Sequence, residues 1–444
     1  MKAVRMYAPR DLRVEEVDIP SYASDECLIK VMAVGVCGSD IPRVNQYGAH
    51  VSPIIVGHEF GGQIVETGAD VTKFKVGDKV TCPPLIPCFK CKYCEIGEYS
   101  LCEDYDYYGS RRDGAFAQYI AVKEGNLLKV DDKVSYEDAA TTDPCANALH
   151  SMMIGEFKPG NSVCVYGAGP IGLFAVQYAK IKGASKIIAV DVWEEKLEMA
   201  KKNGADVVIN SMKEDAVAKV MEATGGNGAD IVIDYSGAPI CQKAAINSAA
   251  KLGKVVFLGI SHQGLELSEK EVDKILRREL SIKGSWNSFG KPFPGSDWTG
   301  AVDLYENHGM TAKDIISHRL SLDEAPAMFE KIDKIKPAYD VTYKCVLFLC
   351  KVLLVVDILI TSMAVAGRYI PFIPDPAWSE EVVLTCMSYM AVLSAALAIR
   401  RGAHIRMTAF DRYLPSNLVK SLDILADLAV FALAIIMITV GWKY

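Results

Sequence analysis

The chain has 444 residues, enough for two or three domains, and its 48 Lys and Arg against 55 Asp and Glu leave a net charge of −7. This acidic balance argues against a nucleic-acid-binding protein, which would present a basic face. The apolar residues are spread unevenly: up to about Cys345 the chain is typical of a soluble α/β protein, and beyond that residue it becomes strongly apolar.

The first segment, Met1 to Pro20, is charged and alternating and lacks the apolar stretch of a signal peptide. We therefore expect the front part of the chain to stay in the cytosol. There the 13 cysteines of the chain would serve as thiols and metal ligands rather than as a disulfide framework.

A candidate metal site comes next. Cys37 in VGVCGSD and His58 in GHEF each end an apolar run, where a strand can deliver a ligand. Glu59 follows His58 directly, and Asp143 comes after a predicted turn in TTDPCANALH. A catalytic zinc needs about three protein ligands and an open position, which Cys37, His58 and either Glu59 or Asp143 supply. The alternative is two unrelated core residues, but the glycine spacing of GHEFGGQIVETGADV resembles the signature of the zinc alcohol dehydrogenases, and this resemblance implies a metal.

Three residues near this site have two interpretations each. Ser39, beside Cys37, is the candidate first acceptor of the substrate's proton, or a turn hydroxyl. Asp40 is an acid that orients a metal ligand, or a turn residue. His50 in YGAHVSP lines the substrate site, or is a surface histidine.

Four cysteines follow within fifteen residues, at Cys88, Cys91, Cys94 and Cys102. Two gaps of two residues and a longer third gap suit a cage of four thiolates around one structural Zn²⁺. An iron–sulfur cluster usually has its fourth Cys after three residues and before a Pro, whereas here seven residues intervene and Glu103 follows. The sequence therefore predicts structural zinc.

Further along, GSRRDG places Arg111 and Arg112 side by side. Guanidinium groups fit phosphate in a bidentate manner, so the pair is a candidate clamp for a substrate phosphate. A solvated basic turn is the alternative.

The segment from Asn161 to Val190 predicts a dinucleotide site. A strand at Val163–Tyr166 leads into a glycine-rich turn and a helix, and a second strand ends at Asp191, 19 residues past the last glycine of the turn. This is the required context for G-x-G-x-x-G, and the helix N-terminus supplies N–H groups to the phosphates. The cofactor-binding candidates in the turn are Gly167, Gly169, Pro170, Ile171 and Gly172.

Asp191 would bind the ribose hydroxyls and repel a 2′-phosphate, which favours NAD over NADP. Lys196 lies along the adenosine ribose, or is an exposed helix lysine. Further strands predicted at Ile231–Asp234 and Val255–Leu258 continue a parallel sheet.

These motifs together resemble the zinc-dependent medium-chain dehydrogenases of the polyol branch. The segments that carry the resemblance are CGSD, YGAH, GHEF, the four-cysteine segment, YGSRRDGAFAQY, GAGPIG, KILRREL and GSW. The resemblance implies two zinc ions per chain, with Glu59 and Asp143 as alternating acidic ligands of the catalytic zinc. Asp143 departs from the family, whose members usually carry Glu there.

The resemblance also implies a fold and a substrate class. We expect a GroES-like catalytic domain over 1–150, completed by about 288–348, and a Rossmann NAD-binding domain over 151–287. The expected substrate is a small polyol or polyol phosphate, and the expected assembly is a homo-oligomer formed through the dehydrogenase part.

The region 349–444 is expected to be all-α and to cross a membrane. Apolar segments lie near 346–370, 382–399 and 424–442, and the middle one is long enough to span a bilayer. Buried core helices are the alternative. The loop between the second and third segments is rich in Lys and Arg and the loop around Trp378 has none, which puts the basic loop and the dehydrogenase in the cytoplasm.

This tail resembles the small membrane subunit of a TRAP-type transporter through GRYI, Trp378 with its two glutamates, and RRGAHIR. The resemblance implies four spans, of which this chain shows about three, a bacterial inner membrane, and a large permease subunit as partner. The sequence therefore leaves three hypotheses for the function. The first is a dehydrogenase with a membrane tail, the second a transport subunit carrying a passenger domain, and the third a zinc-stabilised binding module without catalysis.

Overall fold

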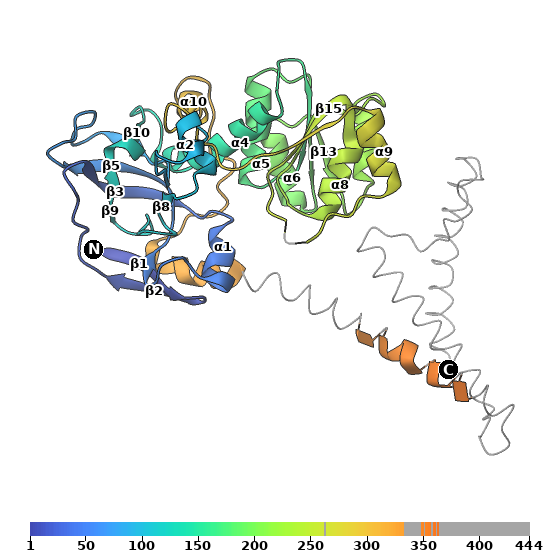
Figure 1. Ribbon diagram of the computed structural model, residues 1–444, viewed down its shortest axis with the longest axis horizontal. Coiled ribbons are helices and arrows are strands. Elements are labelled where there is room, and N and C mark those ends of the chain that lie inside the picture. The colour runs from blue at the N-terminus through green and yellow to red at the C-terminus, as the bar shows by residue number, and fades with distance from the viewer. Residues whose placement is uncertain (262, 333–347, 350, 357, 361, 364–444) are drawn as a thin grey trace. The chain divides into compact units, whose positions relative to one another are not determined.

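The computed structural model describes residues 1–261, 263–332, 348–349, 351–356, 358–360 and 362–363 (Figure 1). The chain divides into two units, Met1–Ile332 and Asp333–Tyr444. All of the predicted zinc and dinucleotide motifs lie in the first unit.

One part of the first unit is built on a parallel sheet of six strands in the order β13-β12-β11-β14-β15-β16. Their bounds in chain order are β11 Ser162–Tyr166, β12 Lys186–Asp191, β13 Val207–Asn210, β14 Ala229–Asp234, β15 Ala249–Phe257 and β16 Ser281–Gly284. In order of appearance this is 3-2-1-4-5-6, the order of the Rossmann fold. The predicted strands are confirmed, although β15 ends one residue earlier than expected, at Phe257.

Helices cover both faces of this sheet, so its central strands are buried on both sides and apolar throughout. Val163 and Val165 of β11 join one core with α5, and Cys164 and Tyr166 join another with α7 and α8. The helices of this part are α5 Pro170–Ile181, α6 Glu194–Lys202, α7 Ala216–Ala223, α8 Pro239–Ser248 and α9 Glu269–Arg277.

The other part of the first unit is built from antiparallel strands (Figure 1). A five-stranded sheet has the order β10-β6-β5-β3-β9, a three-stranded sheet the order β2-β1-β4, and β7 pairs with β8. The bounds are β1 Lys2–Ala8, β2 Asp11–Glu16, β3 Glu26–Gly35, β4 Ile54–Ile55, β5 Glu59–Thr67, β6 Lys79–Thr81, β7 Leu85–Ile86, β8 Asp106–Tyr107, β9 Tyr119–Lys123 and β10 Leu128–Lys129.

Short helices connect the antiparallel strands and lead to the parallel sheet. They are α1 Asp40–Pro42, a π-helical turn Arg43–Tyr47, α2 Lys92–Ile96, α3 Tyr136–Ala140, α4 Thr142–Ile154 and α10 Ser296–Asn307, with 3₁₀ turns at Tyr99–Leu101, Glu124–Asn126 and Leu322–Glu324. Fully buried Trp298 of α10 belongs to the same core as α4 and α5. The chain after the parallel sheet therefore returns to pack on the helix that precedes the sheet.

The second unit is described only in short pieces between residues 348 and 363. Most of their large apolar side chains are exposed, for example Phe348 at 68%, Val355 at 55% and Leu359 at 64%. No helix within the described residues is both long and apolar enough to traverse a bilayer. The predicted segments 382–399 and 424–442, and most of 346–370, lie outside the described residues.

Candidate active site

Two adjacent strands bring the first metal candidates together. Cys37 lies two residues beyond β3, and His58 immediately precedes β5 rather than ending a strand. The antiparallel register of the two strands sets Gly35 opposite Glu59. Residues separated by about twenty positions in the chain therefore meet at one end of the sheet.

Glycines are required around this meeting point. Gly57 has φ +91°, and a Cβ there would lie 2.5 Å from the ring of Phe116. At Gly35 a Cβ would lie 2.5 Å from a carboxylate oxygen of Glu59. The backbone before His58 thus adopts a conformation open mainly to glycine, which gives a physical reason for the G-H-E spacing.

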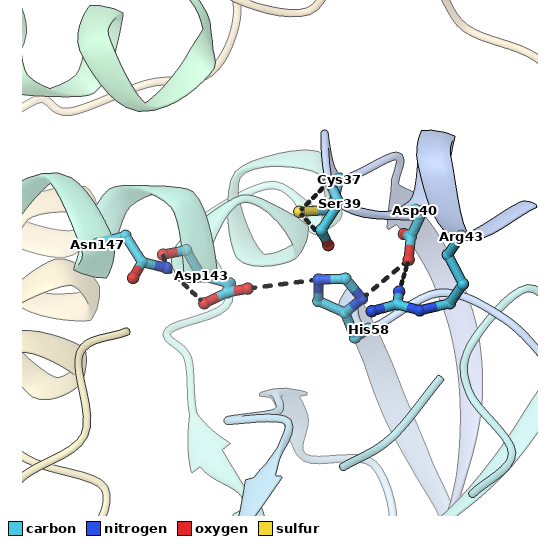
Figure 2. Close-up of polar contacts among 7 residues, drawn as sticks. All are labelled: Cys37, Ser39, Asp40, Arg43, His58, Asp143 and Asn147. Carbon is cyan, nitrogen blue, oxygen red and sulfur yellow. Dashed lines mark hydrogen bonds and ion pairs between the residues drawn. The ribbon is translucent and has the colours of Figure 1, made fainter. Parts of the chain in front are cut away.

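The side chains of Cys37, His58 and Glu59 converge, with their ligand atoms all within 4.8 Å of one another. Asp143 lies in the first turn of α4, and its Oδ2 is 3.9 Å from Nε2 of His58. The amide of Asn147 donates to the other oxygen of Asp143 at 3.0 Å. Figure 2 shows His58 between Asp143 on one side and Asp40 on the other.

Asp40 lies next to His58, and Ser39 lies next to Cys37 (Figure 2). Oδ1 of fully buried Asp40 is 3.5 Å from Nδ1 of His58, and the same oxygen pairs with the guanidinium of Arg43. Ser39 donates its hydroxyl to Sγ of Cys37 at 3.2 Å. Asp40 therefore lies within ion-pair distance of the imidazole, a position compatible with the first of its two sequence interpretations.

Burial and crowding of acids govern the electrostatics. Burial raises the pKa of Glu59 to about 8 and that of Asp143 to about 6. Burial also raises the pKa of the Cys37 thiol, and the neighbouring Glu59 adds to this shift. The site combines one histidine, one thiol and three buried carboxyls. A bound dication would offset the negative charge that these acidic groups carry when they lose their protons. The residues therefore fit a zinc ion.

The four clustered cysteines also fit a metal. Cys88, Cys91, Cys94 and Cys102 offer sulfur atoms within 4.8 Å of one another, and Sγ of Cys88 lies 3.9 Å from Sγ of Cys94. A tetrahedral cage with Zn–S bonds of about 2.3 Å has edges of about 3.8 Å, whereas a disulfide requires about 2.05 Å. All ten cysteines among the described residues are free.

The thiols of this cluster are not equivalent. Backbone N–H groups, first that of Glu103, lower the pKa of Cys91 to about 6. Burial instead raises the pKa of Cys94 to about 12. One member is thus ready to ligate as thiolate, and the buried member loses its proton only when a metal replaces it.

The glycine-rich turn lies between β11 and α5. Gly167 has φ +98°, and a Cβ on Gly172 would lie 2.1 Å from the carbonyl oxygen of Gly167. A Cβ on Gly169 would meet nothing within 4 Å, so the space above the turn is open. Pro170 is the first residue of α5, and its neighbour Ile171 follows in the first turn. The turn has the shape required to hold a pyrophosphate at a helix N-terminus.

Asp191 ends β12, next to this turn. Its carboxylate accepts hydrogen bonds from the backbone N–H groups of Ala168 at 2.8 Å, Val192 at 2.7 Å and Trp193 at 3.0 Å. Asp191 therefore also braces the glycine-rich turn, a contact that the motif alone did not predict. Lys196 lies on α6, half-buried.

A cavity of about 680 Å³ is lined by residues from both predicted sites. Glu59 and Pro144 line it from the metal side and Pro170 lines it from the glycine-rich turn. The metal cluster and the dinucleotide turn are thus neighbours within the first unit.

The remaining candidates are separated by the fold. His50 is exposed, and its N–H donates to the carbonyl of Ser110 at 3.2 Å. Arg111 lies with its guanidinium carbon 4.5 Å from the ring centre of Tyr105, whereas Arg112 is 2.7 Å from the carboxylate of Asp106. The two arginines, predicted to act as a pair, have different partners.

Sequence analysis missed two residues at the metal cluster. Tyr107 packs edge-on against His58 with ring centres 5.5 Å apart, and Arg43 pairs with Asp40. The alternation of Tyr105 and Tyr107 around β8 was a usable signal, because alternate residues of a strand share one face. Arg43 follows Asp40 by three positions, a spacing at which opposite charges pair on a helix.

The tail has its own family match. Residues 357–444 match the model of the tripartite ATP-independent periplasmic transporters, DctQ component. The resemblance of the tail to a TRAP small subunit is thereby confirmed as a similarity of sequence.

Two family models match the first unit, the alcohol dehydrogenase GroES-like domain over residues 23–132 and the zinc-binding dehydrogenase over residues 170–307. Galactitol 1-phosphate 5-dehydrogenase of Escherichia coli (strain K12) is 37% identical over 326 residues, which cover 73% of this chain and 94% of that protein. Sorbitol dehydrogenase of Bacillus subtilis (strain 168) is 37% identical over 338 residues, covering 74% of this chain and 93% of that protein.

The fold agrees with these relatives. The crystal structure of galactitol-1-phosphate dehydrogenase from Escherichia coli superposes with a TM-score of 0.72 at 35% identity and covers 76% of this chain and 97% of that one. The architecture is a GroES-like part joined to a Rossmann part. The chain belongs to the zinc-binding medium-chain alcohol dehydrogenases.

Proposed function

We propose that the chain oxidises a CH–OH group of a small polyol or polyol phosphate and transfers the hydride to NAD. One observation carries this proposal: Glu59, whose ligand atom converges with those of Cys37 and His58, lines the same cavity as Pro170 of the glycine-rich turn. The relatives named for galactitol 1-phosphate and sorbitol support the substrate class.

The metal ligands in this proposal are Cys37 and His58, with Glu59 or Asp143 as the acid. Glu59 lies within the ligand group, and Asp143 is held 3.9 Å from His58 by its contact with Asn147. A zinc ion held there supplies Lewis acidity toward the substrate hydroxyl, and bound NAD supplies the hydride acceptor. Asp40 keeps the imidazole of His58 oriented for ligation.

Ser39 is the residue that we assign to proton transfer. Its hydroxyl already contacts the Cys37 sulfur at 3.2 Å, so its oxygen is available beside the metal ligands. Ser39 accepts the proton that the substrate hydroxyl releases and passes its own proton to solvent through the cofactor ribose or a water. Cys88, Cys91, Cys94 and Cys102 hold a second, structural zinc.

The proposed domain boundaries are 1–150 with 288–348 for the catalytic domain and 151–287 for the NAD-binding domain. We further propose a homo-oligomer formed through these domains. The dehydrogenase would be cytoplasmic, with 349–444 as a membrane-spanning segment of about three helices in a bacterial inner membrane.

A panel of polyols and polyol phosphates tests the function, with NAD reduction followed by absorbance on the full chain. Turnover of galactitol, sorbitol, D-arabitol or one of their phosphates supports the proposal. A zinc-loaded protein that binds NADH but turns over none of these alcohols would instead support a binding module without catalysis.

Cofactor choice is expected to change when Asp191 is replaced by Ser. The Asp191 carboxylate accepts hydrogen bonds and repels a 2′-phosphate, so Asp191→Ser should weaken NADH binding by about tenfold or more and lose its discrimination against NADPH. A hydrogen bond to a charged group contributes about 1.5–3 kcal/mol. Fluorescence titration with NADH and NADPH measures both affinities.

Asp206→Ser is the matched control for this change. Asp206 likewise accepts a backbone hydrogen bond, from Ile187 at 2.8 Å, but it does not contact the glycine-rich turn. It should lower stability without altering the ratio of the two affinities. An unchanged NADH-to-NADPH ratio in Asp191→Ser would show that another residue sets cofactor choice.

A second function, the membrane subunit of a TRAP-type transporter with a dehydrogenase passenger and a large permease partner, is favoured by the match over 357–444. The exposed apolar side chains from Phe348 to Leu359 support a role of this region in a lipid or protein interface.

Expression of the full chain and of residues 1–348 separates the two functions. Under the dehydrogenase proposal, residues 1–348 remain in the supernatant and reduce NAD, while the full chain sediments with membranes and resists alkaline carbonate. If residues 1–348 have no activity and the full chain supports solute uptake, the transport function is the correct one.

A further inference from the structure

The turn after β8 directs two consecutive arginines to different sides. The carbonyl oxygen of Tyr107 accepts hydrogen bonds from the N–H groups of Arg111 at 3.0 Å and Arg112 at 3.3 Å. Their side chains have different neighbours: Arg111 lies over the ring of Tyr105, whereas Arg112 pairs with the carboxylate of Asp106.

Arg112 has its charge satisfied by protein groups. Nε lies 2.7 Å from a carboxylate oxygen of Asp106, one terminal nitrogen lies 4.0 Å from Glu26, and the guanidinium carbon is 5.3 Å from the ring centre of Tyr108. Arg112 also lines a cavity of about 620 Å³ together with Glu26 and Asp113. Its surroundings are acidic, which disfavours an anionic ligand.

Arg111 differs from its neighbour in lacking an acidic partner. Among residues 1–332 that the structure describes, no carboxylate lies within ion-pair distance of Arg111. Its guanidinium carbon lies over the ring of Tyr105, 4.5 Å from the ring centre. Stacking on an aromatic ring fixes the planar group and leaves its N–H donors free along the edge.

A continuous row of rings connects Arg111 with the metal cluster. Tyr105 meets Tyr107 edge-on with ring centres 6.3 Å apart, and Tyr107 meets His58 edge-on at 5.5 Å. Two aromatic side chains, those of Tyr105 and Tyr107, therefore link the guanidinium of Arg111 to the metal ligand His58.

Two further basic side chains, those of His50 and Arg43, bear on the surroundings of Arg111. The backbone N–H of His50 donates to Ser110, the residue before Arg111, at 3.2 Å. Burial lowers the pKa of His50, and the positive charges of Arg111 and Arg43 lower it further. Arg43 in turn pairs with Asp40, which lies 3.5 Å from His58. Arg43 is thus paired with an acid, and the lowered pKa of His50 favours a neutral imidazole, which can still donate one hydrogen bond.

We propose that Arg111, assisted by His50, forms a subsite for a phosphate monoester group of the substrate, and that Arg112 takes no part in it. The proposal rests on the proposed function, because the same substrate would present its hydroxyl to the metal cluster. The substrate would lie along Tyr105 and Tyr107, with its oxidised carbon at the metal ligands and its phosphate at Arg111.

Chemical modification of the full chain tests the subsite without any need for turnover. Phenylglyoxal reacts with accessible arginines, and peptide mass spectrometry locates the product at Arg111 or Arg112. Arg111 should react faster than Arg112, and inorganic phosphate or galactitol 1-phosphate should protect Arg111 alone. Saturating NADH in every sample keeps the cofactor's own phosphates constant.

Lack of protection at Arg111, or equal protection of both arginines, would overturn the subsite. This result would leave the dehydrogenase function intact with an unphosphorylated polyol as its substrate. Protection at Arg111 in a protein that oxidises no polyol would mean the opposite: the anion site stands and the proposed function fails.

Kinetics with matched substrates provide the second test. Arg111→Ala should raise KM for galactitol 1-phosphate by about ten- to a hundredfold, as expected for loss of a hydrogen bond to a charged group, with kcat little changed. KM for galactitol should change by less than about twofold. Arg111→Lys should recover part of the loss, because it keeps the charge without the bidentate geometry.

Arg112→Ala is the matched control, since it removes the same side chain one position away. It should alter the melting temperature through the loss of its ion pair with Asp106, while the ratio of the two KM values stays as in the parent. Two results would contradict the assignment. One is an equal rise of KM for galactitol 1-phosphate and galactitol in Arg111→Ala, and the other is a rise of KM for galactitol 1-phosphate alone in Arg112→Ala.

Discussion

Replacing Cys37 with Ala is expected to abolish turnover, by about a thousandfold or more, while NADH binding persists within about twofold of the parent. Cys37 is one of the three residues whose ligand atoms converge within 4.8 Å, and a metal that polarises the substrate contributes several kcal/mol to transition-state stabilisation. About 4 kcal/mol corresponds to a factor of a thousand. The dinucleotide turn belongs to separate strands and should keep its shape.

Three measurements check this expectation: zinc content by elemental analysis, steady-state turnover, and NADH affinity by fluorescence. Zinc should fall from two ions per chain to one. Cys27→Ala is the matched control, because Cys27 is fully buried on β3 of the same sheet and does not belong to the ligand group. Full activity of Cys37→Ala with one zinc per chain would refute the assigned role.

Cys91→Ser is expected to lower stability rather than catalysis. Structural zinc contributes folding free energy directly, about 10–16 kcal/mol in small zinc domains. Loss of one of the four thiolates should lower the free energy of unfolding of the larger unit Met1–Ile332 by at least about 2 kcal/mol. For a unit of this size that corresponds to a fall in melting temperature of roughly 3 °C or more.

The surroundings of the cluster explain why the effect should spread. Phe89, next to Cys88, packs edge-on against Tyr99 at 5.5 Å, and Tyr99 packs against Phe293 at 5.6 Å. Phe293 comes from the segment that returns after the parallel sheet, so the cluster fixes this packing. Without the metal the segment 88–102 loses its cross-link and these aromatic contacts loosen.

Thermal melting together with zinc analysis measures this change. Cys241→Ser is the control, since Cys241 is also half-buried but lies on α8, away from the four-cysteine cluster. The control should melt near the parent temperature and keep two zinc ions. A parent with a single zinc and a Cys91→Ser variant that melts like it would exclude a structural zinc at this cluster.

The sequence alone was sufficient wherever the chemistry depends on residues close together in the chain. Gly167, Gly169 and Gly172 form one turn, and the four cysteines lie within fifteen positions, so their spacing constrains their geometry. The strands β11, β12 and β14 were predictable because helices bury both of their faces and leave continuous apolar runs. The family resemblance rested on these same local patterns.

Only the tertiary structure decided which distant residues meet. The register of β3 against β5 brings Glu59 to Cys37, and the start of α4 brings Asp143 to His58. The alignment of two strands depends on packing over their whole length, which a motif does not contain.

The two arginines show that the sequence does not reveal the partners of a side chain even for adjacent residues. Arg111 and Arg112 are neighbours, and the sequence treats them alike. The turn closed on the carbonyl of Tyr107 directs Arg112 to Asp106 and Arg111 to Tyr105. Local composition determined that a cation would be present, but the direction of each side chain, and hence the ligand it can bind, came from the backbone of the folded turn.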